Sequence, residues 1–148
     1  MKSSVRFFHH TAGVYLPMIV KDRIIKLATA GVDAGEMPAV WLSTNELWDH
    51  TATKMASVNG LPVQLTKQQQ YERFGLARIE VVKLEGLISW EEFRIKSGVS
   101  KLSYDFMENL GRLKGAEPEE WWAYFQPIPS NAWLRIEIWN GTEWKSAY

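Results

Sequence analysis

The sequence predicts an α+β fold: one compact domain with mixed or antiparallel sheets, short helices and a C-terminal β-hairpin. Strand-like and helix-like segments are interleaved without the strict repeat of a doubly wound parallel sheet. The 148 residues fit a single domain, 1–148, of ordinary size. Near the end, Asn140-Gly141 separates two strand-like segments, and this is the pattern of a type I′ hairpin turn.

The first half of the chain is predicted to hold strands and helices in irregular order. Aromatic and β-branched residues predict the first strand, and Pro17 suits the first turn of the helix that follows. Ser43, Thr44 or Asn45 is expected to cap a second helix. The expected elements are a strand over residues 5–11, a helix over 15–22, an extended segment over 24–27, an exposed loop over 29–38, a buried strand over 39–43 and a helix over about 45–56.

The second half is predicted to hold helices around one strand, followed by the hairpin. Capping-box spacings that begin at Thr66 and Ser89 predict two helix starts. Pro118 suits the first turn of a brief helix that carries Trp121 and Trp122. The expected elements are helices over 66–73, 89–98 and 102–113, a strand over 76–83, the brief helix from 118, and hairpin strands over 133–139 and 142–148.

Strand alternation assigns the hairpin side chains to two faces. A two-residue loop pairs Trp139 with Thr142 and sets Trp144 opposite Glu137. One face of the first strand is expected to join the core: Leu134, Ile136 and Ile138. The other face is aromatic and charged: Trp133, Arg135, Glu137 and Trp139.

Composition excludes several classes of protein. The 17 basic and 17 acidic side chains cancel, so nucleic-acid binding through phosphate charge is not favoured. The absence of cysteine excludes disulfides and cysteine-based zinc sites. The longest apolar runs are far shorter than the ~20 residues of a membrane span, and the chain starts without a signal-peptide pattern. We therefore expect a soluble cytoplasmic protein without a membrane partner.

Sequence motifs exclude further enzyme classes and leave a few candidate side chains. The chain has no Gly-rich phosphate loop, Rossmann fingerprint or Gly-x-Ser-x-Gly elbow. His9 and His10 point to opposite faces of a strand, so no metal site is expected there. Glu137, beside tryptophans on a strand, is suited to hold a hydroxyl or a developing cation. The alternative is an ordinary exposed strand face. Glu80, in a similar local pattern, is the second candidate carboxylate.

Three segments carry a resemblance to a known family. They are Phe7-Phe8-His9-His10-Thr11 with the apolar helix after it, Val40-Trp41-Leu42-Ser43-Thr44-Asn45, and Leu134-Arg135-Ile136-Glu137-Ile138. Together they resemble ADP-ribosyltransferase-type folds, in the branch typified by diphtheria toxin and the related tRNA 2′-phosphotransferases. The first two segments also resemble small uncharacterised proteins of bacteria and their phages.

The resemblance implies an NAD-binding protein that transfers ADP-ribose or cleaves NAD. It implies that His9 hydrogen-bonds a ribose and that Glu137 stabilises the oxocarbenium-like transition state. An aromatic side chain would stack on nicotinamide, and since residues 40–45 lack the tyrosine of that branch, Trp41 or Tyr71 is the candidate. The implied catalytic residues are Glu137 and His9. The implied cofactor-binding residues are His9, Thr11, Trp41, Ser43 and Tyr71.

The competing interpretation is a binding module that catalyses nothing. Tryptophan and arginine are enriched at protein interfaces, and five of the eight tryptophans lie close together in the last part of the chain. Such a module would bind a phage protein, a host protein or a nucleotide through an aromatic C-terminal surface. The tryptophans concerned are Trp121, Trp122, Trp133, Trp139 and Trp144.

Overall fold

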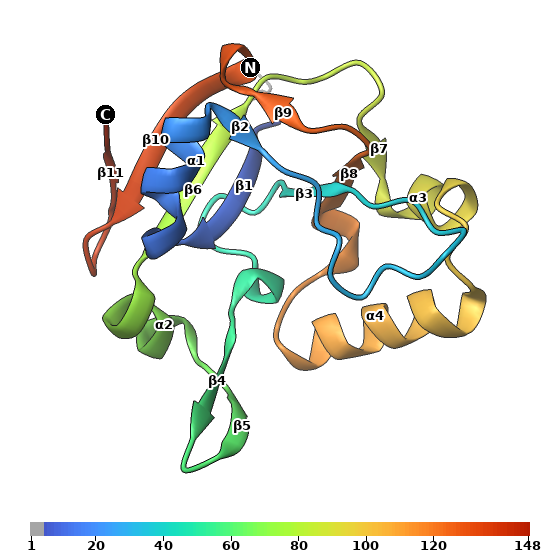
Figure 1. The fold of residues 1–148 in the computed structure, drawn as a ribbon, viewed down its shortest axis with the longest axis horizontal. Coiled ribbons are helices and arrows are strands. Elements are labelled where there is room, and N and C mark those ends of the chain that lie inside the picture. Colours follow the sequence, from blue (N-terminus) through green and yellow to red (C-terminus); the bar gives the residue numbers. More distant parts are fainter. Residues whose placement is uncertain (1–4) are drawn as a thin grey trace.

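We describe the fold from a computed structural model, which places residues 5–148. The α+β class is confirmed, since helices surround a seven-stranded antiparallel sheet and two short antiparallel ribbons (Figure 1). The sheet has the order β11-β10-β6-β1-β3-β8-β7. Its strands are β1 (Phe7–Ala12), β3 (Val40–Ser43), β6 (Leu76–Val81), β7 (Ile88–Ser89), β8 (Trp121–Tyr124), β10 (Trp133–Trp139) and β11 (Trp144–Ser146). The ribbons pair β2 (Ile24–Ile25) with β9 (Ile128–Pro129), and β4 (Met55–Val58) with β5 (Leu61–Gln64).

Side chains cap most of the α-helix starts. Thr66 and Gln69 form the predicted reciprocal capping box of α2, and Ser89 caps α3 by accepting a hydrogen bond from the N–H of Glu92. The α-helices are α1 (Leu16–Asp22), α2 (Lys67–Phe74), α3 (Trp90–Lys96) and α4 (Lys101–Leu113). Single 3-10 turns are η1 (Gly13–Tyr15), η2 (His50–Ala52), η3 (Pro118–Glu120) and η4 (Ser130–Ala132).

Two hydrophobic cores hold the elements together. The larger one lies on the face of the sheet that α1 and the β2–β9 ribbon cover, and Leu16, Ile25 and Ile128 from those elements are buried in it. From β6 the sheet contributes Ala77, Ile79 and Val81, which alternate along the strand and so share one face. The smaller core lies at the far end of the sheet, where α3 packs against β7 and β8 around Trp90.

The junction between β1 and β3 positions the candidate site. These neighbouring strands share a single register pair, Phe8 opposite Ser43. By contrast, β1 pairs with β6 from Phe7 to Ala12, and β3 pairs with β8 along its whole length. The sheet is therefore continuous on both sides of the junction, while β1 and β3 diverge beyond it.

The predicted helix over about 45–56 is wrong. Asn45 Oδ1 accepts a hydrogen bond from the N–H of Trp48 (3.1 Å), and Asp49 Oδ1 accepts one from the N–H of Thr51 (3.0 Å). Short polar side chains that bond nearby backbone groups favour turns over a helix. The segment is therefore a loop with one 3-10 turn, and it leads into β4.

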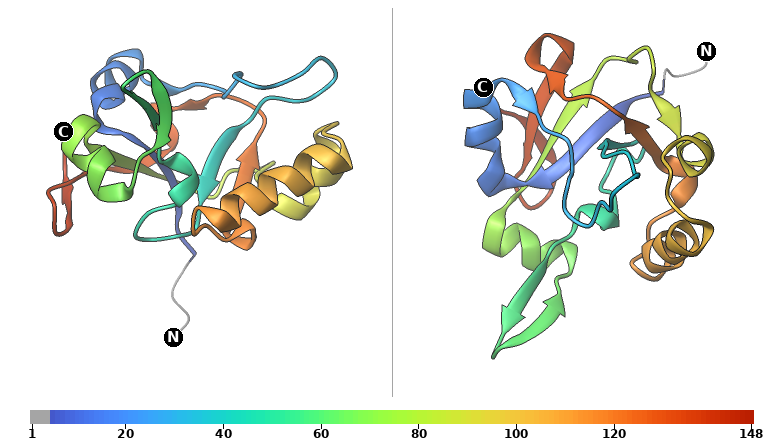
Figure 2. Two further views of the ribbon diagram at one scale, coloured as in Figure 1. Left: turned by 90° about the horizontal axis from the view of Figure 1, so that it is seen from below. Right: turned by 45° about the vertical axis from the view of Figure 1, so that its right-hand side comes forward.

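The β4–β5 hairpin, to which the sequence analysis assigns no strand, projects from the body of the molecule (Figures 1 and 2). Its turn residues, Asn59 and Gly60, have φ values of 52° and 79°. An Asn-Gly pair between strand-like segments is the same type I′ signal that predicts the C-terminal hairpin. The two-residue turn agrees with that signal, since Val58 pairs with Leu61 on either side of it.

The C-terminal hairpin is confirmed, but its register differs from the prediction. Trp139 pairs with Trp144, so the loop has four residues and Ser146, not Trp144, lies opposite Glu137. Asn140 explains the longer loop, because its side-chain oxygen accepts hydrogen bonds from the N–H groups of residues 142 and 143 at 2.9 Å each.

An irregularity in β10 changes which of its side chains face the core. The register with β6 shifts between Trp133 and Arg135, so Trp133 packs on the large core together with Ile136. Leu134, predicted to be a core residue, is 57% exposed. Ile138, also predicted for the core, is 41% exposed.

The brief helix predicted to carry two tryptophans is also wrong. Only η3 forms there, and Trp121 and Trp122 belong to β8, where they pair with Ser43 and Leu42. This pairing brings the chain just after η3 beside the end of β3. A sequence pattern cannot show it, since the two segments are far apart in the chain.

Candidate functional site

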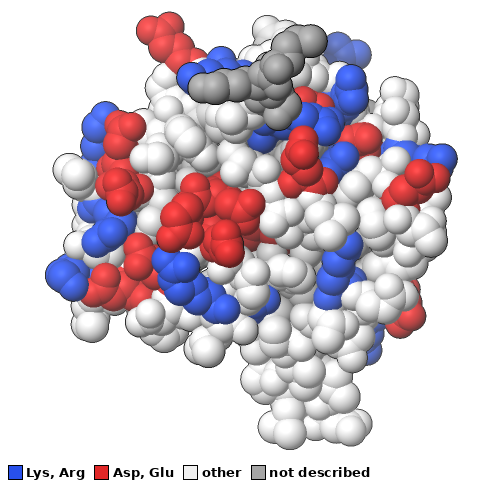
Figure 3. Space-filling model, turned by 180° about the vertical axis from the view of Figure 1, so that it is seen from behind, with Lys and Arg blue, Asp and Glu red and all other residues white. Residues whose placement is uncertain are grey.

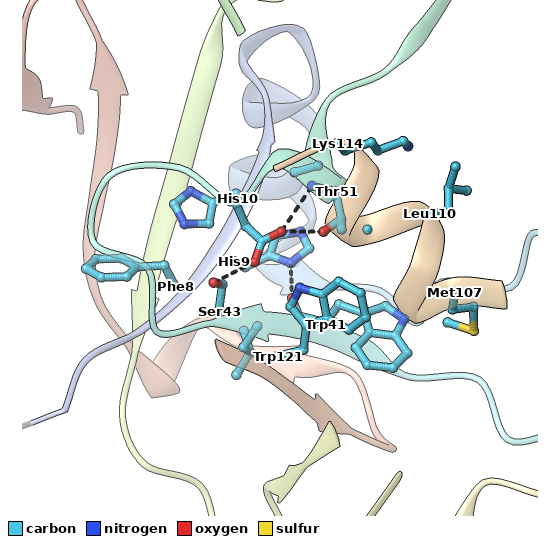
Figure 4. Close-up of a pocket in the computed structure, with 14 residues that line it drawn as sticks. Phe8, His9, His10, Trp41, Ser43, Thr51, Met107, Leu110, Lys114 and Trp121 are labelled. Carbon is cyan, nitrogen blue, oxygen red and sulfur yellow. Dashed lines mark hydrogen bonds between the residues drawn. The ribbon is translucent and has the colours of Figure 1, made fainter. Parts of the chain in front are cut away.

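A cavity of about 300 Å³ opens where β1 and β3 diverge. Its walls come from both strands, from the loop around η2, from α4 and from Trp121. Figure 4 shows His9, Ser43 and Thr51 on one side and Leu110 and Met107 of α4 on the other. The walls are largely apolar, and a few polar groups converge on them, as in typical small-molecule sites.

The two histidines of β1 are both neutral donors to backbone carbonyl groups. Nδ1 of His9 donates to the carbonyl oxygen of Trp41 (3.0 Å), and Nε2 of His10 donates to that of Asn45 (3.1 Å). Burial lowers the pKa of His9, and burial lowers the pKa of His10 to about 3. Each neutral ring therefore keeps one nitrogen as an acceptor: Nε2 in His9 and Nδ1 in His10.

Two buried polar atoms of the cavity residues have no hydrogen-bond partner among residues 5–148. They are Nδ1 of His10 and Nε1 of Trp121. One is an acceptor and the other is a donor. A buried polar group without a partner typically costs about 1–3 kcal/mol, and both atoms belong to residues of the cavity wall.

Asp49 organises the polar end of the cavity. This buried carboxylate accepts a hydrogen bond from Ser43 Oγ at 2.8 Å and two from Thr51, from its N–H at 3.0 Å and from its Oγ1 at 2.6 Å. It forms no ion pair with a residue of the described part of the chain. The carboxylate therefore fixes the hydroxyl groups of Ser43 and Thr51 in place.

The wall from α4 depends on a close approach to Trp121. A Cβ atom at Gly111 would lie 2.5 Å from Cη2 and Cζ2 of the Trp121 ring. That ring is buried and packs edge-on against Trp90, with ring centroids 5.1 Å apart, so it cannot easily move. Glycine at this position lets α4 close the cavity.

Gly111→Ala is expected to lower the free energy of unfolding by about 1–3 kcal/mol, because the added methyl group must displace α4 or the tryptophan ring. Urea unfolding would measure it. The control is Asn109→Ala on the exposed side of the same helix, expected to change stability by less than about 0.5 kcal/mol. Equal stability of Gly111→Ala and the wild type would contradict the close contact of α4 with Trp121.

The structure brings together some of the residues that the sequence suggested for a site. His9, Trp41 and Ser43 line the cavity. A larger cavity, of about 590 Å³, lies on the other side of Trp41. The remaining suggested residues line neither of these two cavities: Thr11, Tyr71, Glu80 and Glu137.

Glu137 is held in a buried ion pair two strands away from β1. Its Oε1 accepts a hydrogen bond from Nε of Arg78 at 3.0 Å, and both side chains are almost fully buried. The Arg78 guanidinium also lies over the rings of Phe8 (4.3 Å) and Trp144 (4.5 Å). Glu137 and His9 therefore share neither of the two cavities, and Oε1 of Glu137 is engaged by Arg78.

Glu80, the second candidate carboxylate, is also paired. Arg6 donates two hydrogen bonds to it, at 2.9 and 3.2 Å. This contact holds the pKa of Glu80 below its ordinary value. Both strand glutamates therefore have structural partners.

Glu120 is a carboxylate that the sequence does not single out, and it adjoins the cavity wall without lining the cavity itself. It directly precedes Trp121, its carbonyl group accepts a hydrogen bond from the N–H of Thr44 (3.0 Å), and its side chain accepts one from Asn45 (3.3 Å). Burial, together with the charge of Asp49, raises its pKa. No sequence motif marks it; only the pairing of β3 with β8 places it here.

The neighbourhood of Glu120 is acidic. Glu117 and Glu119 also contribute to raising its pKa, and Glu120 forms no ion pair with a described residue. Figure 3 shows the face of the molecule opposite to the view of Figure 1, where acidic side chains gather near the centre and basic ones are scattered around them. A carboxylate without a cationic partner is free to act on a developing positive charge.

The tryptophans of the C-terminal segment do not form one surface. Trp121 is buried in the cavity wall, and Trp122 and Trp133 pack against the large core. Trp139 and Trp144 lie on the other face of the hairpin, where Trp144 donates to the carbonyl oxygen of Leu47 (3.0 Å). The predicted aromatic surface is thus reduced to two half-buried rings.

Comparisons with family models, with curated proteins and with solved structures find no match for this chain. Among residues 5–148, no three His, Asp or Glu side chains are grouped so that they could hold a metal ion. No helix in this range is long and apolar enough to cross a membrane.

Proposed function

We propose that the cavity between β1 and β3 binds the nicotinamide end of NAD, and that the protein cleaves NAD or transfers its ADP-ribose. The observation that carries the proposal is the pair of unpartnered buried atoms, His10 Nδ1 and Trp121 Nε1. Nicotinamide is a planar ring with a primary carboxamide, which offers one donor and one acceptor on the same edge. The resemblance of the β1 and β3 segments to ADP-ribosyltransferases supports the same ligand.

In this proposal the carboxamide NH₂ donates to His10 Nδ1, and the carboxamide oxygen accepts from Trp121 Nε1. The indole of Trp41, which lines the cavity, provides a face for the ring. Nε2 of His9 is the acceptor for a ribose hydroxyl. A cavity of about 300 Å³ holds the ring and part of the ribose, and the rest of the dinucleotide extends outside.

We assign the catalytic carboxylate to Glu120 instead of Glu137. As the bond between ribose and nicotinamide breaks, both electrons leave on the ring nitrogen and positive charge develops on the ribose. Glu120 stabilises that charge, and water or an acceptor nucleophile then forms the new bond and releases a proton. Glu120 is suited to this role because it directly precedes Trp121 of the cavity wall and has no cationic partner among the described residues.

Glu120→Gln is expected to reduce nicotinamide release from NAD at least ~100-fold while the protein stays folded. Its melting temperature should equal or exceed that of the wild type, because the variant removes a partly buried charge that faces Asp49, Glu117 and Glu119. The matched control is Glu119→Gln, which changes the neighbouring, exposed carboxylate and should keep activity. Chromatography of released nicotinamide and thermal unfolding measure the two effects.

NAD binding is tested separately from catalysis. Millimolar NAD should raise the melting temperature of both the wild type and Glu120→Gln and quench tryptophan fluorescence. No shift in either protein would overturn the proposal. A shift without nicotinamide release would overturn its catalytic part and leave a nucleotide-binding module.

A further inference from the structure

The second cavity, of about 590 Å³, has a wall chemistry of its own. It lies between the loop over residues 28–39, Phe93 of α3 and the N-terminal half of α4. Aromatic rings supply much of its wall: Trp41, Phe93 and Phe106. Among the residues that the structure describes, Asp33 and Glu36 are the only charged ones that line it, and both are acidic. Neither forms an ion pair with a residue in the described range.

The exposed face of α4 continues this cavity. Leu102 and Phe106 line it and are nevertheless 83% and 66% exposed. Leu110 and Leu113 extend the same row toward the end of the helix, and Leu113 is 85% exposed. The helical spacing that predicts α4 from the sequence therefore marks an uncovered apolar row, which is typical of an interaction surface.

We infer that this groove, formed by the second cavity and the apolar row of α4, binds a polypeptide segment with an arginine next to apolar side chains. The charge of the cavity selects the occupant: its walls offer two carboxylates without cations, so a neutral or acidic segment would leave them unpaired. Arginine also combines an aliphatic stem with a planar cation that stacks on aromatic rings, and the cavity offers both surfaces. The neighbouring apolar side chains cover Leu102 and Phe106.

The geometry places the arginine and the apolar side chains at different parts of the groove. Asp33 and Glu36 belong to one turn, in which the N–H of Asp33 donates to Glu36 Oε1 (2.8 Å) and the N–H of Glu36 donates to the carbonyl oxygen of Asp33 (3.1 Å). The apolar row leads away from this turn along α4. Trp41 and Met107 separate this groove from the first cavity and line both, so an occupant of the groove contacts the wall of the proposed NAD site. The inference itself does not depend on that proposal.

Binding can be measured with a fluorescein-labelled peptide that holds one arginine among leucines, and with its citrulline counterpart. Fluorescence anisotropy should show binding of the arginine peptide and at least ~10-fold weaker binding of the neutral citrulline peptide. Equal affinity for the two peptides would overturn the inference, because a site selected by charge must distinguish them.

Variants locate the binding. The double variant Asp33→Asn with Glu36→Gln should bind the arginine peptide at least ~10-fold more weakly than the wild type. Its fold should be kept, because the amide oxygen at position 36 can still accept a hydrogen bond from the N–H of residue 33. The charge-matched control is Glu85→Gln with Glu91→Gln, two exposed acids outside the cavity, which should leave affinity within about twofold.

The double variant Leu102→Ser with Phe106→Ser tests the apolar row. It changes two exposed residues and should keep the fold. Its affinity for the arginine peptide should be at least ~10-fold lower than that of the wild type. Unchanged affinity in either groove double variant would overturn the inference. Sedimentation of the wild type gives a further test. If the wild type is a dimer and the serine double variant is a monomer, the apolar row binds a second copy of the chain. That result would overturn the inference that a peptide occupies the row.

Discussion

Replacing Glu137 with methionine is expected to lower the free energy of unfolding by about 3–5 kcal/mol, the usual cost of leaving one partner of a buried ion pair alone. Arg78 would remain buried among Phe8, Trp144 and the carbonyl group of Glu46, with its Nε unpaired. A guanidinium cannot escape this cost by losing its proton. The variant therefore loses much of the stability of a typical domain.

Urea unfolding of four proteins measures this coupling: the wild type, Glu137→Met, Arg78→Met and the double variant. The double variant should recover part of the loss, since it removes both charges and fills the space with apolar atoms. Glu143→Gln breaks an exposed ion pair with Lys145 and should cost less than about 1 kcal/mol. If Glu137→Met is as stable as the wild type, the ion pair is not structural and Glu137 becomes available again as a catalytic residue.

This ion pair shows why the sequence identified the face of Glu137 but not its role. Alternation along β10 and β6 correctly places Glu137 and Arg78 away from the large core. Pairing between the two strands then sets Glu137 directly opposite Arg78, which lies 59 residues earlier. Periodicity within a strand carries no information about which strand lies beside it, so the partner of a strand charge stays hidden in the sequence.

Local chemistry predicts the elements that depend on it. The capping box at Thr66 and the cap at Ser89 act over a few residues, and both are confirmed, whereas the hairpin at Asn140-Gly141 forms with a four-residue loop instead of the predicted two-residue turn. The segment after β3 fails for an equally local reason. Ser43, Thr44 and Asn45 resemble a helix cap, but Asn45 and Asp49 bond the backbone in turns.

The residues of the candidate site come together only through the pairing of strands that are far apart in the sequence. Of the residues that the resemblance implied for a site, His9, Trp41 and Ser43 line the cavity. Glu120 is one of three glutamates around Pro118 and has no distinguishing pattern. Its position beside Asn45 follows from the pairing of β3 with β8, and its raised pKa follows from burial there.

Acidification is expected to destabilise the protein through His10. Burial holds its pKa near 3 in the folded state, whereas an exposed histidine has a pKa near 6.5. Between these values the unfolded chain binds a proton that the folded protein does not, so stability falls as the pH falls. The full difference corresponds to about 4–5 kcal/mol between pH 7 and pH 3, at about 1.4 kcal/mol per pKa unit. His9, whose pKa burial also lowers, acts in the same direction.

The contribution of His10 is isolated by comparison with His10→Gln. Glutamine can still donate to the carbonyl oxygen of Asn45 but does not titrate, and the carboxylates titrate in both proteins. The variant loses contacts with Trp48 and Trp144, whose ring centroids lie 5.0 and 6.2 Å from that of His10, so the wild type is the more stable protein at neutral pH. Denaturant unfolding at steps from pH 7.5 to 3.5 should show this advantage shrinking by several kcal/mol. A difference in stability that stays constant over this pH range would mean that His10 accepts a proton in the folded state. Its Nδ1 would then be a hydrogen-bond donor, and the orientation proposed for the carboxamide of the ligand would have to be reversed or abandoned.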